Sequence, residues 1–263
     1  TLPKHVIKQL CNPRVIAFFG NFILRDFDLN FKSFDGRHHW HRLNKHVSIG
    51  KSKIYKKEVS SSSKSKVACV PWTKKRNILG KASLKNISID YHLERPIDVC
   101  FIGATSIEKN NDEQNKDPYT IHRKLALHEL KKINHRNTFL SEQFIPYEKY
   151  LEILRSSKIV VSPWGRGEWC WRDFEAVLCG AVLIKPDTSF VKMIPDLYQN
   201  NVYYVPCKPD FSDLQETVNK VLNDYSSFEP MRKNAYNLLA NYTDEEMFAT
   251  FMDNLRKALN QNS

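Results

Sequence analysis

The chain has 263 residues, of which 41% are hydrophobic, and carries a formal net charge of +11 at pH 7. This length is enough to bury one large core or two smaller ones. No run of eighteen apolar residues occurs, so we expect no membrane-spanning helix.

Six cysteines are scattered along the chain without a CxxC pair or a Cys/His spacing suited to zinc. The N-terminus lacks the basic-then-apolar pattern of a signal peptide. We therefore expect buried free thiols in a reducing, cytoplasmic compartment. A Golgi-type lumen would follow instead if an N-terminal anchor had been removed.

The positive charge is concentrated in the first third of the chain. Residues 1–95 contain 20 Lys and Arg against 6 Asp and Glu, a net of +14, whereas residues 96–263 contain 20 against 23, a net of −3. Such a basic block is suited to nucleic acid, an anionic membrane surface or an acidic substrate. The alternative is a solubilising surface with a floppy loop.

Strand and helix patterns alternate from residue 95 onward. Before it, a strand is predicted over 14–19 and a mobile loop over 51–66. After it, short apolar runs predict strands at 97–103, 138–145, 158–163, 181–186 and 202–206. Helical patterns occur between them, at 119–133, at 147–157 and in a helix beginning near Glu168. This alternation predicts an α/β fold with a parallel sheet and helices on both faces.

The C-terminal zone is predicted to be helical. Ser212 with Gln215, and Thr243 with Glu246, have the spacing of a capping box. The last helix carries an apolar stripe that we interpret as core packing, formed by Met247, Phe251, Leu255 and Leu259.

One segment, "SPWGRGEWCWRDFEAVLCGAVLIKP" at 162–186, combines two apolar runs with an unusually charged and aromatic connection. A helix that begins near Glu168 places Arg172 and Glu175 on the same face. A second face, buried against the sheet, would hold Trp171, Phe174 and Leu178. The charged face could be no more than a surface ion-pair ladder, worth a few tenths of a kcal/mol.

Glycines at two strand ends favour a ligand site over that alternative. Gly165 and Gly167 precede the predicted helix, and the strand at 97–103 ends in Gly103. Backbone N–H groups at a helix start, with Arg166 and Arg172 beside them, suit a diphosphate. Ligands of open α/β sheets bind outside the carboxyl ends of the strands. The segment contains neither GxGxxG nor GxxxxGK[ST], so dinucleotide and P-loop sites lack their motifs.

The succession of "RPIDVCFIGATS", "YTIHRKLAL" and the segment from 162 to 187 resembles the C-terminal half of exostosin-like glycosyltransferases. The resemblance covers about residues 35–190 and is closest from 95 to 187. It implies a GT-B-like architecture of two Rossmann-like lobes with parallel sheets, the N-terminal lobe being small. We accordingly expect a basic acceptor-side lobe at 1–95, a nucleotide-sugar lobe at 96–240, and a helix at 241–263 that packs back across the junction.

The resemblance implies transfer of a sugar from a UDP-sugar to a hydroxyl of a glycan or glycoprotein. It favours UDP-xylose and inversion to a β-linkage, and it implies no metal and no cofactor other than the UDP-sugar as co-substrate. Retaining GT-B enzymes place two glutamates eight positions apart, whereas Glu168 and Glu175 are seven apart, which fits the inverting group better.

The resemblance also assigns a nucleotide-sugar site. Arg123, Arg166 and Arg172 would stabilise charge on the diphosphate, and Glu175 would accept hydrogen bonds from the ribose hydroxyls. Backbone groups of Phe144 and Ile145 would contact the base. The complete set is Gly103, Thr105, Arg123, Phe144, Ile145, Ser162, Pro163, Trp164, Gly165, Arg166, Gly167, Glu168, Arg172 and Glu175.

An inverting reaction needs a general base on the acceptor side. The tract "RDFDLNFKSFDGRHHWH" concentrates acidic and histidine side chains in the N-terminal zone, and Asp35, His38 and His39 are the candidates. The "HHWH" sequence lacks i, i+4 spacing and further ligands, so we predict no metal site.

Two other functions remain open. A nucleic-acid-binding module would explain the basic zone, with Trp40 and Trp72 available for stacking. It would not explain arginines and carboxylates gathered at strand ends, so we predict no nucleic acid partner. A non-catalytic relative that binds glycans or nucleotides fits the same residues, because the general base is not identified.

Overall fold

The computed structural model describes residues 18–20, 22–24, 67–69, 89–105, 118–133, 136–164 and 170–260. The predicted mobile loop at 51–66 lies outside these residues. The chain divides into two compact units, one formed by 1–73, 189–196 and 242–263 and the other by 74–188 and 197–241.

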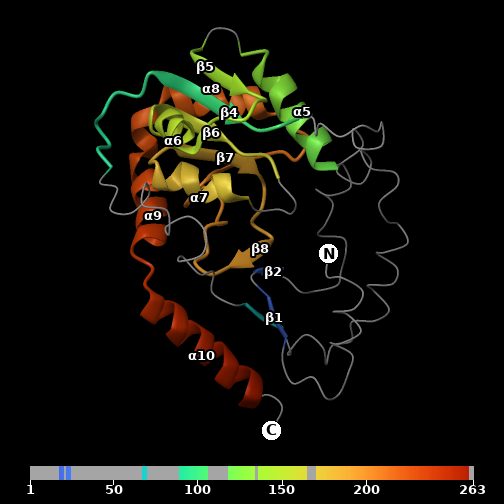
Figure 1. The fold of residues 1–263 in the computed structure, drawn as a ribbon, viewed down its shortest axis with the longest axis vertical. Helices are drawn as coiled ribbons and strands as arrows, with labels where there is room; N and C mark the ends of the chain where they lie inside the picture. Colours follow the sequence, from blue (N-terminus) through green and yellow to red (C-terminus); the bar gives the residue numbers. More distant parts are fainter. Residues whose placement is uncertain are drawn as a thin grey trace. The chain divides into compact units, whose positions relative to one another are not determined.

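The second unit contains a five-stranded parallel sheet (Figure 1). Its strands are β4 (Ile97–Ile102), β5 (Thr138–Ser141), β6 (Ser157–Val161), β7 (Val182–Pro186) and β9 (Val205–Cys207). Their spatial order is β5-β4-β6-β7-β9, with Cys100 of β4 paired to Phe139 on one side and to Val160 on the other. The strand order therefore reverses between β4 and β6, and this is the topological switch point of the sheet.

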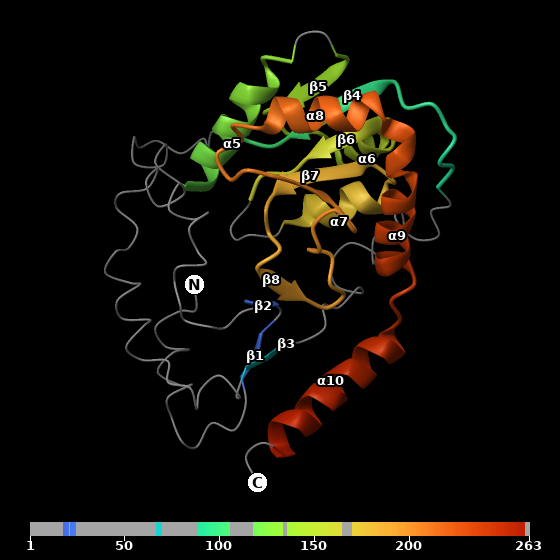
Figure 2. The same cartoon turned by 180° about the vertical axis from the view of Figure 1, so that it is seen from behind.

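Helices cover both faces of this sheet, as predicted. In both views α5 (Pro118–Leu130) and α8 (Leu214–Asn223) lie on one face, and α6 (Tyr147–Arg155) and α7 (Trp171–Leu178) lie on the other (Figures 1 and 2). A 3₁₀ turn (Tyr225–Phe228) and α9 (Glu229–Ala240) follow α8.

The core of the second unit follows from the two-residue period of its strands. Val99 and Phe101 of β4 are fully buried in the cluster that includes Leu127 of α5 and Val218 of α8. The intervening Cys100 is equally buried on the opposite face. Strands covered on both faces read as continuous apolar runs, which is why their positions could be predicted.

Two buried arginines hold the carboxyl end of α7. Arg95 donates from Nη1 to the carbonyl of Ser157 and from Nη2 to the carbonyl of Cys179, both at 2.9 Å. Arg232 donates from Nε to the carbonyl of Gly180 at 2.7 Å. Cationic donors at this end satisfy carbonyls that lack helical partners and oppose the helix dipole.

The described residues of the first unit form short strands and one helix. β1 (Phe18–Gly20) pairs in parallel with β3 (Val67–Cys69), and β2 (Phe22–Leu24) pairs antiparallel with β8 (Val191–Met193). The strand β8 was not predicted. The same unit contains α10 (Asp244–Asn260), and in its apolar stripe only Phe251 has a described side chain, which is half-buried.

One capping box forms and the other does not. The N–H of Thr243 donates to Glu246 Oε2 at 2.8 Å, and the N–H of Glu246 donates to Thr243 Oγ1 at 3.1 Å, as predicted. The prediction of a capping box formed by Ser212 and Gln215 was wrong, because α8 begins at Leu214, one residue later than this box requires. Its N-cap is Asp213, and the Gln215 amide donates to Glu129 instead.

Two element boundaries also differ from the prediction. The helix expected near Glu168 begins at Trp171. The last strand of the sheet begins at Val205 rather than at residue 202, because Asn201 adopts a positive φ of 59° and its N–H bonds to the Tyr204 carbonyl at 2.9 Å in a turn.

The four cysteines whose side chains are described, Cys100, Cys170, Cys179 and Cys207, are free thiols, and all but Cys170 are buried. None of the described helices combines the length and the apolar character needed to cross a bilayer.

The close packing around Gly180 can be tested by substitution. Its φ is +73°, and a Cβ at this position would lie 2.7 Å from Ile89 Cγ2 and 2.8 Å from Arg95 Nη2. Gly180→Ala should lower the free energy of unfolding by about 2–4 kcal/mol, from the left-handed backbone and the displaced neighbours together. Urea denaturation measures this loss, with Ser226→Ala on the exposed 3₁₀ turn as the control. A change below 0.5 kcal/mol would contradict the packing described here.

Candidate functional site

The start of α7 is anchored by a buried carboxylate. Asp173, the third residue of α7, accepts hydrogen bonds from Ser162 Oγ at 2.6 Å and from Tyr198 OH at 2.6 Å. The backbone N–H of Cys170, the N-cap residue, donates to Asp173 Oδ2 at 3.0 Å. The carboxylate therefore joins α7 to the end of β6 and to the segment after β8.

Asp173 also forms an ion pair with Lys185 on β7. Lys185 Nζ lies 3.1 Å from Asp173 Oδ2, and both side chains are 0% exposed. The geometry is that of an ion pair, since Nζ makes no aligned hydrogen bond within the described structure, and the ammonium lies 5.7 Å from the centre of the Tyr198 ring. A charge this deeply buried requires its partner.

A neutral histidine fixes the segment that follows β6. The N–H of Trp164 donates to His122 Nδ1 at 3.2 Å, so Nε2 of His122 bears the proton and donates to the Pro209 carbonyl at 2.9 Å. The imidazole stacks on Trp164 and contacts Phe211. Burial lowers the pKa of His122 to about 3, helped by the Lys185 charge. His122 is therefore a neutral structural side chain.

Two arginines meet at the switch point of the sheet. A Cβ built on Gly103, the residue after β4, would lie 3.0 Å from Arg172 Nη2 and 3.8 Å from Arg123 Cδ. Arg123 comes from α5 and donates to the Ala104 carbonyl at 3.1 Å, while Arg172 comes from α7 and lies over the Phe101 ring at 5.8 Å. No hydrogen-bond partner for the buried Nε of Arg172 is found in the described residues. A side chain at this position would crowd the Arg172 guanidinium, whereas its distance to Arg123 would be an ordinary contact.

Glu175 lies one helical turn beyond Arg172 and is 8% exposed. It accepts hydrogen bonds from two tyrosines of α6, Tyr147 to Oε1 at 3.2 Å and Tyr150 to Oε2 at 2.7 Å. Burial raises the pKa of both phenols, and the Arg172 charge opposes that rise at Tyr150. Arg172, Glu175 and Tyr150 are thus parts of one electrostatic cluster.

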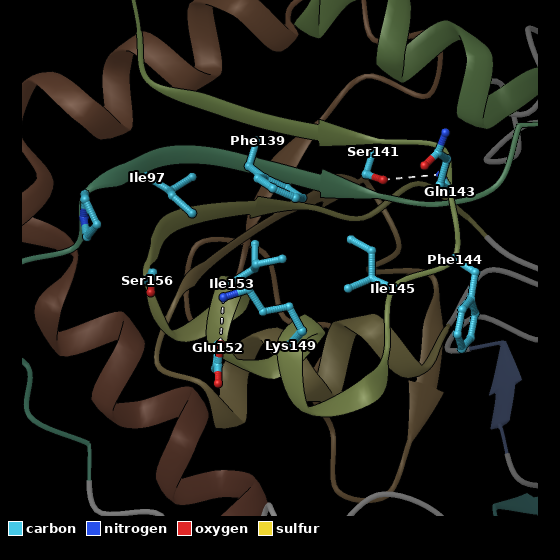
Figure 3. Close-up of a pocket in the computed structure, with 11 residues that line it drawn as sticks. Ile97, Phe139, Ser141, Gln143, Phe144, Ile145, Lys149, Glu152, Ile153 and Ser156 are labelled. Atoms are coloured by element: carbon cyan, nitrogen blue, oxygen red, sulfur yellow. Dashed lines mark hydrogen bonds and ion pairs between the residues drawn. The ribbon is translucent and has the colours of Figure 1, made fainter.

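A groove of about 580 Å³ lies between α6 and the strands β4 and β5 (Figure 3). Its apolar lining comes from Ile97, Phe139, Ile145 and Ile153. Phe144 stands at one end of the groove and is 92% exposed. Ser141, which also lines the groove, accepts the Gly103 N–H at its carbonyl at 2.9 Å, so the groove adjoins the switch point.

The structure places the remaining predicted residues as follows. Thr105 is buried and donates to Glu142. The Trp164 indole is buried and donates to Thr188 Oγ1 at 3.0 Å, so this side chain packs in the interior. Ser162 is bonded to Asp173, and the Pro163 carbonyl accepts from Cys170 Sγ. Seven predicted residues lie outside the described part of the chain: Gly165, Arg166, Gly167, Glu168, Asp35, His38 and His39.

The predicted faces of α7 were partly wrong. Phe174 and Leu178 are buried as expected, but Trp171 is 39% exposed. Asp173 points inward because α7 begins at residue 171, and because Ser162 and Tyr198 donate hydrogen bonds to its carboxylate in the interior. The prediction missed Asp173, Lys185 and His122. A lysine inside the apolar run "AVLIKP" was the available signal, because a buried lysine needs a counter-charge.

Within the described residues, no three His, Cys, Asp or Glu side chains are grouped so as to hold a metal ion.

Comparisons with known proteins give likenesses among solved structures alone. No family model matches the sequence, and no curated protein matches it. Among solved structures, the chain is similar to the crystal structure of TarM, with 16% identity and a TM-score of 0.43. The alignment covers 83% of this chain and 45% of the TarM chain, so this chain spans less than half the length of that protein.

The Asp173–Lys185 pair can be tested by a double-mutant cycle. Asp173→Asn leaves the Lys185 ammonium buried without a counter-charge and should lower the free energy of unfolding by about 3–5 kcal/mol. Adding Lys185→Met removes that charge, so the double variant should be more stable than Asp173→Asn alone. Urea denaturation of the four proteins measures the coupling. Additive effects of the two substitutions would show that the side chains do not interact.

The buried His122 predicts a specific dependence of stability on pH. Its pKa is about 3 in the folded state, against an ordinary value of 6.5. Between these values the unfolded chain binds one proton more than the folded chain, so the contribution of His122 is complete above pH 6.5 and is lost as pH falls. The slope is up to about 1.4 kcal/mol per pH unit.

The free energy of unfolding measured from pH 7 to pH 4 should therefore fall less steeply in His122→Gln than in the parent protein. His128→Gln, which replaces an exposed histidine of the same helix, is the matched control for loss of a histidine side chain. Equal slopes in the parent protein and in His122→Gln would mean that His122 has the same pKa in the folded and in the unfolded chain.

Proposed function

We propose that this protein is a glycosyltransferase that takes its sugar from a nucleoside diphosphate sugar, with UDP-sugar as the donor. The observation that carries the proposal is the meeting of Arg123 and Arg172 beside Gly103 at the switch point of a parallel sheet. Open α/β sheets bind ligands at this place, and two guanidinium groups suit a diphosphate.

The neighbouring groups suit the other parts of such a donor. Glu175, beside Arg172, offers carboxylate oxygens to the ribose hydroxyls. The groove beyond Ser141 has an apolar floor and an exposed aromatic ring, Phe144, at one end, which suits a flat base. A nucleotide would therefore extend from the switch point, past Glu175, toward the loop after β5.

The chemistry assigned to the arginines is stabilisation of the leaving group. In an inverting transfer an acceptor hydroxyl attacks the anomeric carbon as the bond to the diphosphate oxygen breaks. The negative charge grows on the diphosphate, where fixed guanidinium groups lower the energy of the transition state. Positive side chains in this position would allow the transfer to proceed without a metal ion.

The acceptor side of the proposal rests on the resemblance alone. A general base must take the proton of the attacking hydroxyl, and Asp35, His38 and His39 are the candidates in the basic N-terminal region. A GT-B arrangement, a glycan or glycoprotein acceptor and UDP-xylose as donor belong to the same proposal.

Binding of UDP tests the donor site. UDP should raise the melting temperature of the parent protein, because a ligand that binds only the folded state stabilises it. Arg172→Met and Arg123→Met should each weaken UDP binding about 10- to 100-fold, as expected for loss of a charge-assisted hydrogen bond. Isothermal titration calorimetry measures these affinities.

The control is Arg136→Met, which removes an arginine at the amino end of β5, away from the switch point. It should bind UDP as the parent protein does. Stabilisation by oligonucleotides but not by UDP would overturn the proposal in favour of nucleic acid binding. If UDP binds, its release from a UDP-sugar on addition of an acceptor separates an active transferase from a non-catalytic relative.

A further inference from the structure

The two tyrosines that bind Glu175 differ in the quality of their hydrogen bonds. Tyr150 OH lies 2.7 Å from Oε2, close to the distance expected for a hydroxyl bound to a carboxylate. Tyr147 OH lies 3.2 Å from Oε1, which is long for such a bond. The two carboxylate oxygens are therefore not equally held.

The surroundings of the two tyrosines also differ. The Arg172 charge opposes the burial-driven rise in the pKa of Tyr150, whereas the Glu175 charge adds to the rise at Tyr147. Tyr147 is the first residue of α6 and directly follows the loop that carries the exposed Phe144. The rings of the two tyrosines stack with their centres 6.0 Å apart, and Tyr147 is the one nearer the start of the helix.

A carboxylate accepts about four hydrogen bonds, but Glu175 is 8% exposed, and space at its oxygens is limited. Tyr147, the more weakly bound donor, is displaced from Oε1 more easily than Tyr150 is from Oε2. A hydroxyl of a bound ligand therefore reaches Oε1 more readily. The exchange replaces one O–H···O bond with another, so it leaves no buried acceptor without a partner.

We infer that Tyr147 is a placeholder for a ligand hydroxyl on Oε1 of Glu175, whereas Tyr150 is a positioning residue that fixes Oε2. The inference deepens the proposed function and rests on it, because the hydroxyl in question is one of the two on the ribose of the donor. Tyr147 occupies the acceptor in the free protein and yields it to the nucleotide.

This assignment predicts that two similar substitutions change the affinity for UDP in opposite directions. Tyr147→Phe removes the competing donor, so UDP should bind about two- to tenfold more tightly, the range expected for one net hydrogen bond. Tyr150→Phe frees the carboxylate to turn, so UDP should bind about two- to tenfold more weakly. A merely structural role would weaken binding in both variants or change neither.

A second ligand identifies the hydroxyl groups as the cause. With 2′,3′-dideoxy-UDP, which presents neither ribose hydroxyl, the gain in Tyr147→Phe should disappear. Tyr203→Phe, at the turn before β9 on the amino side of the sheet, is the matched control and should bind both nucleotides as the parent protein does. Calorimetry at a temperature well below all melting points measures each affinity.

The outcomes separate this inference from the proposed function. If the parent protein binds UDP but Tyr147→Phe binds it equally or less tightly, the placeholder role is overturned and the donor site stands. If the gain persists with 2′,3′-dideoxy-UDP, the ribose is not the group that takes Oε1, and the inference also falls. If the parent protein binds no UDP, the proposed function fails together with the inference.

Discussion

The constraint on which this structure depends is a carboxylate and an ammonium group buried together at the carboxyl edge of a parallel sheet. Asp173 and Lys185 are 0% exposed, and neither could remain charged there without the other. Because Asp173 also binds Ser162 and the N-cap backbone of α7, the pair determines where the helix starts. Arg172 is the residue before Asp173, so its place at Gly103 follows from the same contacts.

The short helix α7 illustrates why such anchors are needed. It has eight residues, and isolated helices of this length are not stable in water. Contacts hold it at both ends: Asp173 at its start, and Arg95 and Arg232 at the carbonyls of Cys179 and Gly180, which follow its last residue. Held in this way, the helix presents Arg172 and Glu175 from a rigid element, which is what selective recognition of a diphosphate and a sugar would require.

The described ionisable groups around the switch point differ in how their charge is balanced. His122 is kept neutral by burial, and Lys185 is balanced by Asp173. Arg172, by contrast, has no carboxylate within 4 Å in the described structure and keeps Nε without a hydrogen bond. Among the residues that the structure describes, Arg172 therefore places a positive charge without a carboxylate partner beside Gly103, where Arg123 also reaches. This local charge, rather than the basic N-terminal third, supports the proposed donor site.

The sequence by itself determined the order of the elements, the parallel sheet and the gathering of Gly103, Arg123 and Arg172 at one edge. The elements, the sheet and the positions of Gly103 and Arg172 follow from local patterns, because buried parallel strands are continuously apolar and their carboxyl ends share an edge. The place of Arg123 was implied only by the resemblance to exostosin-like glycosyltransferases. Only the tertiary structure decided that Asp173 points inward, that Lys185 is its partner, and that Tyr147 and Tyr150 bind Glu175. Those pairings join residues distant in the chain, and their free energy depends on burial, which no local pattern records.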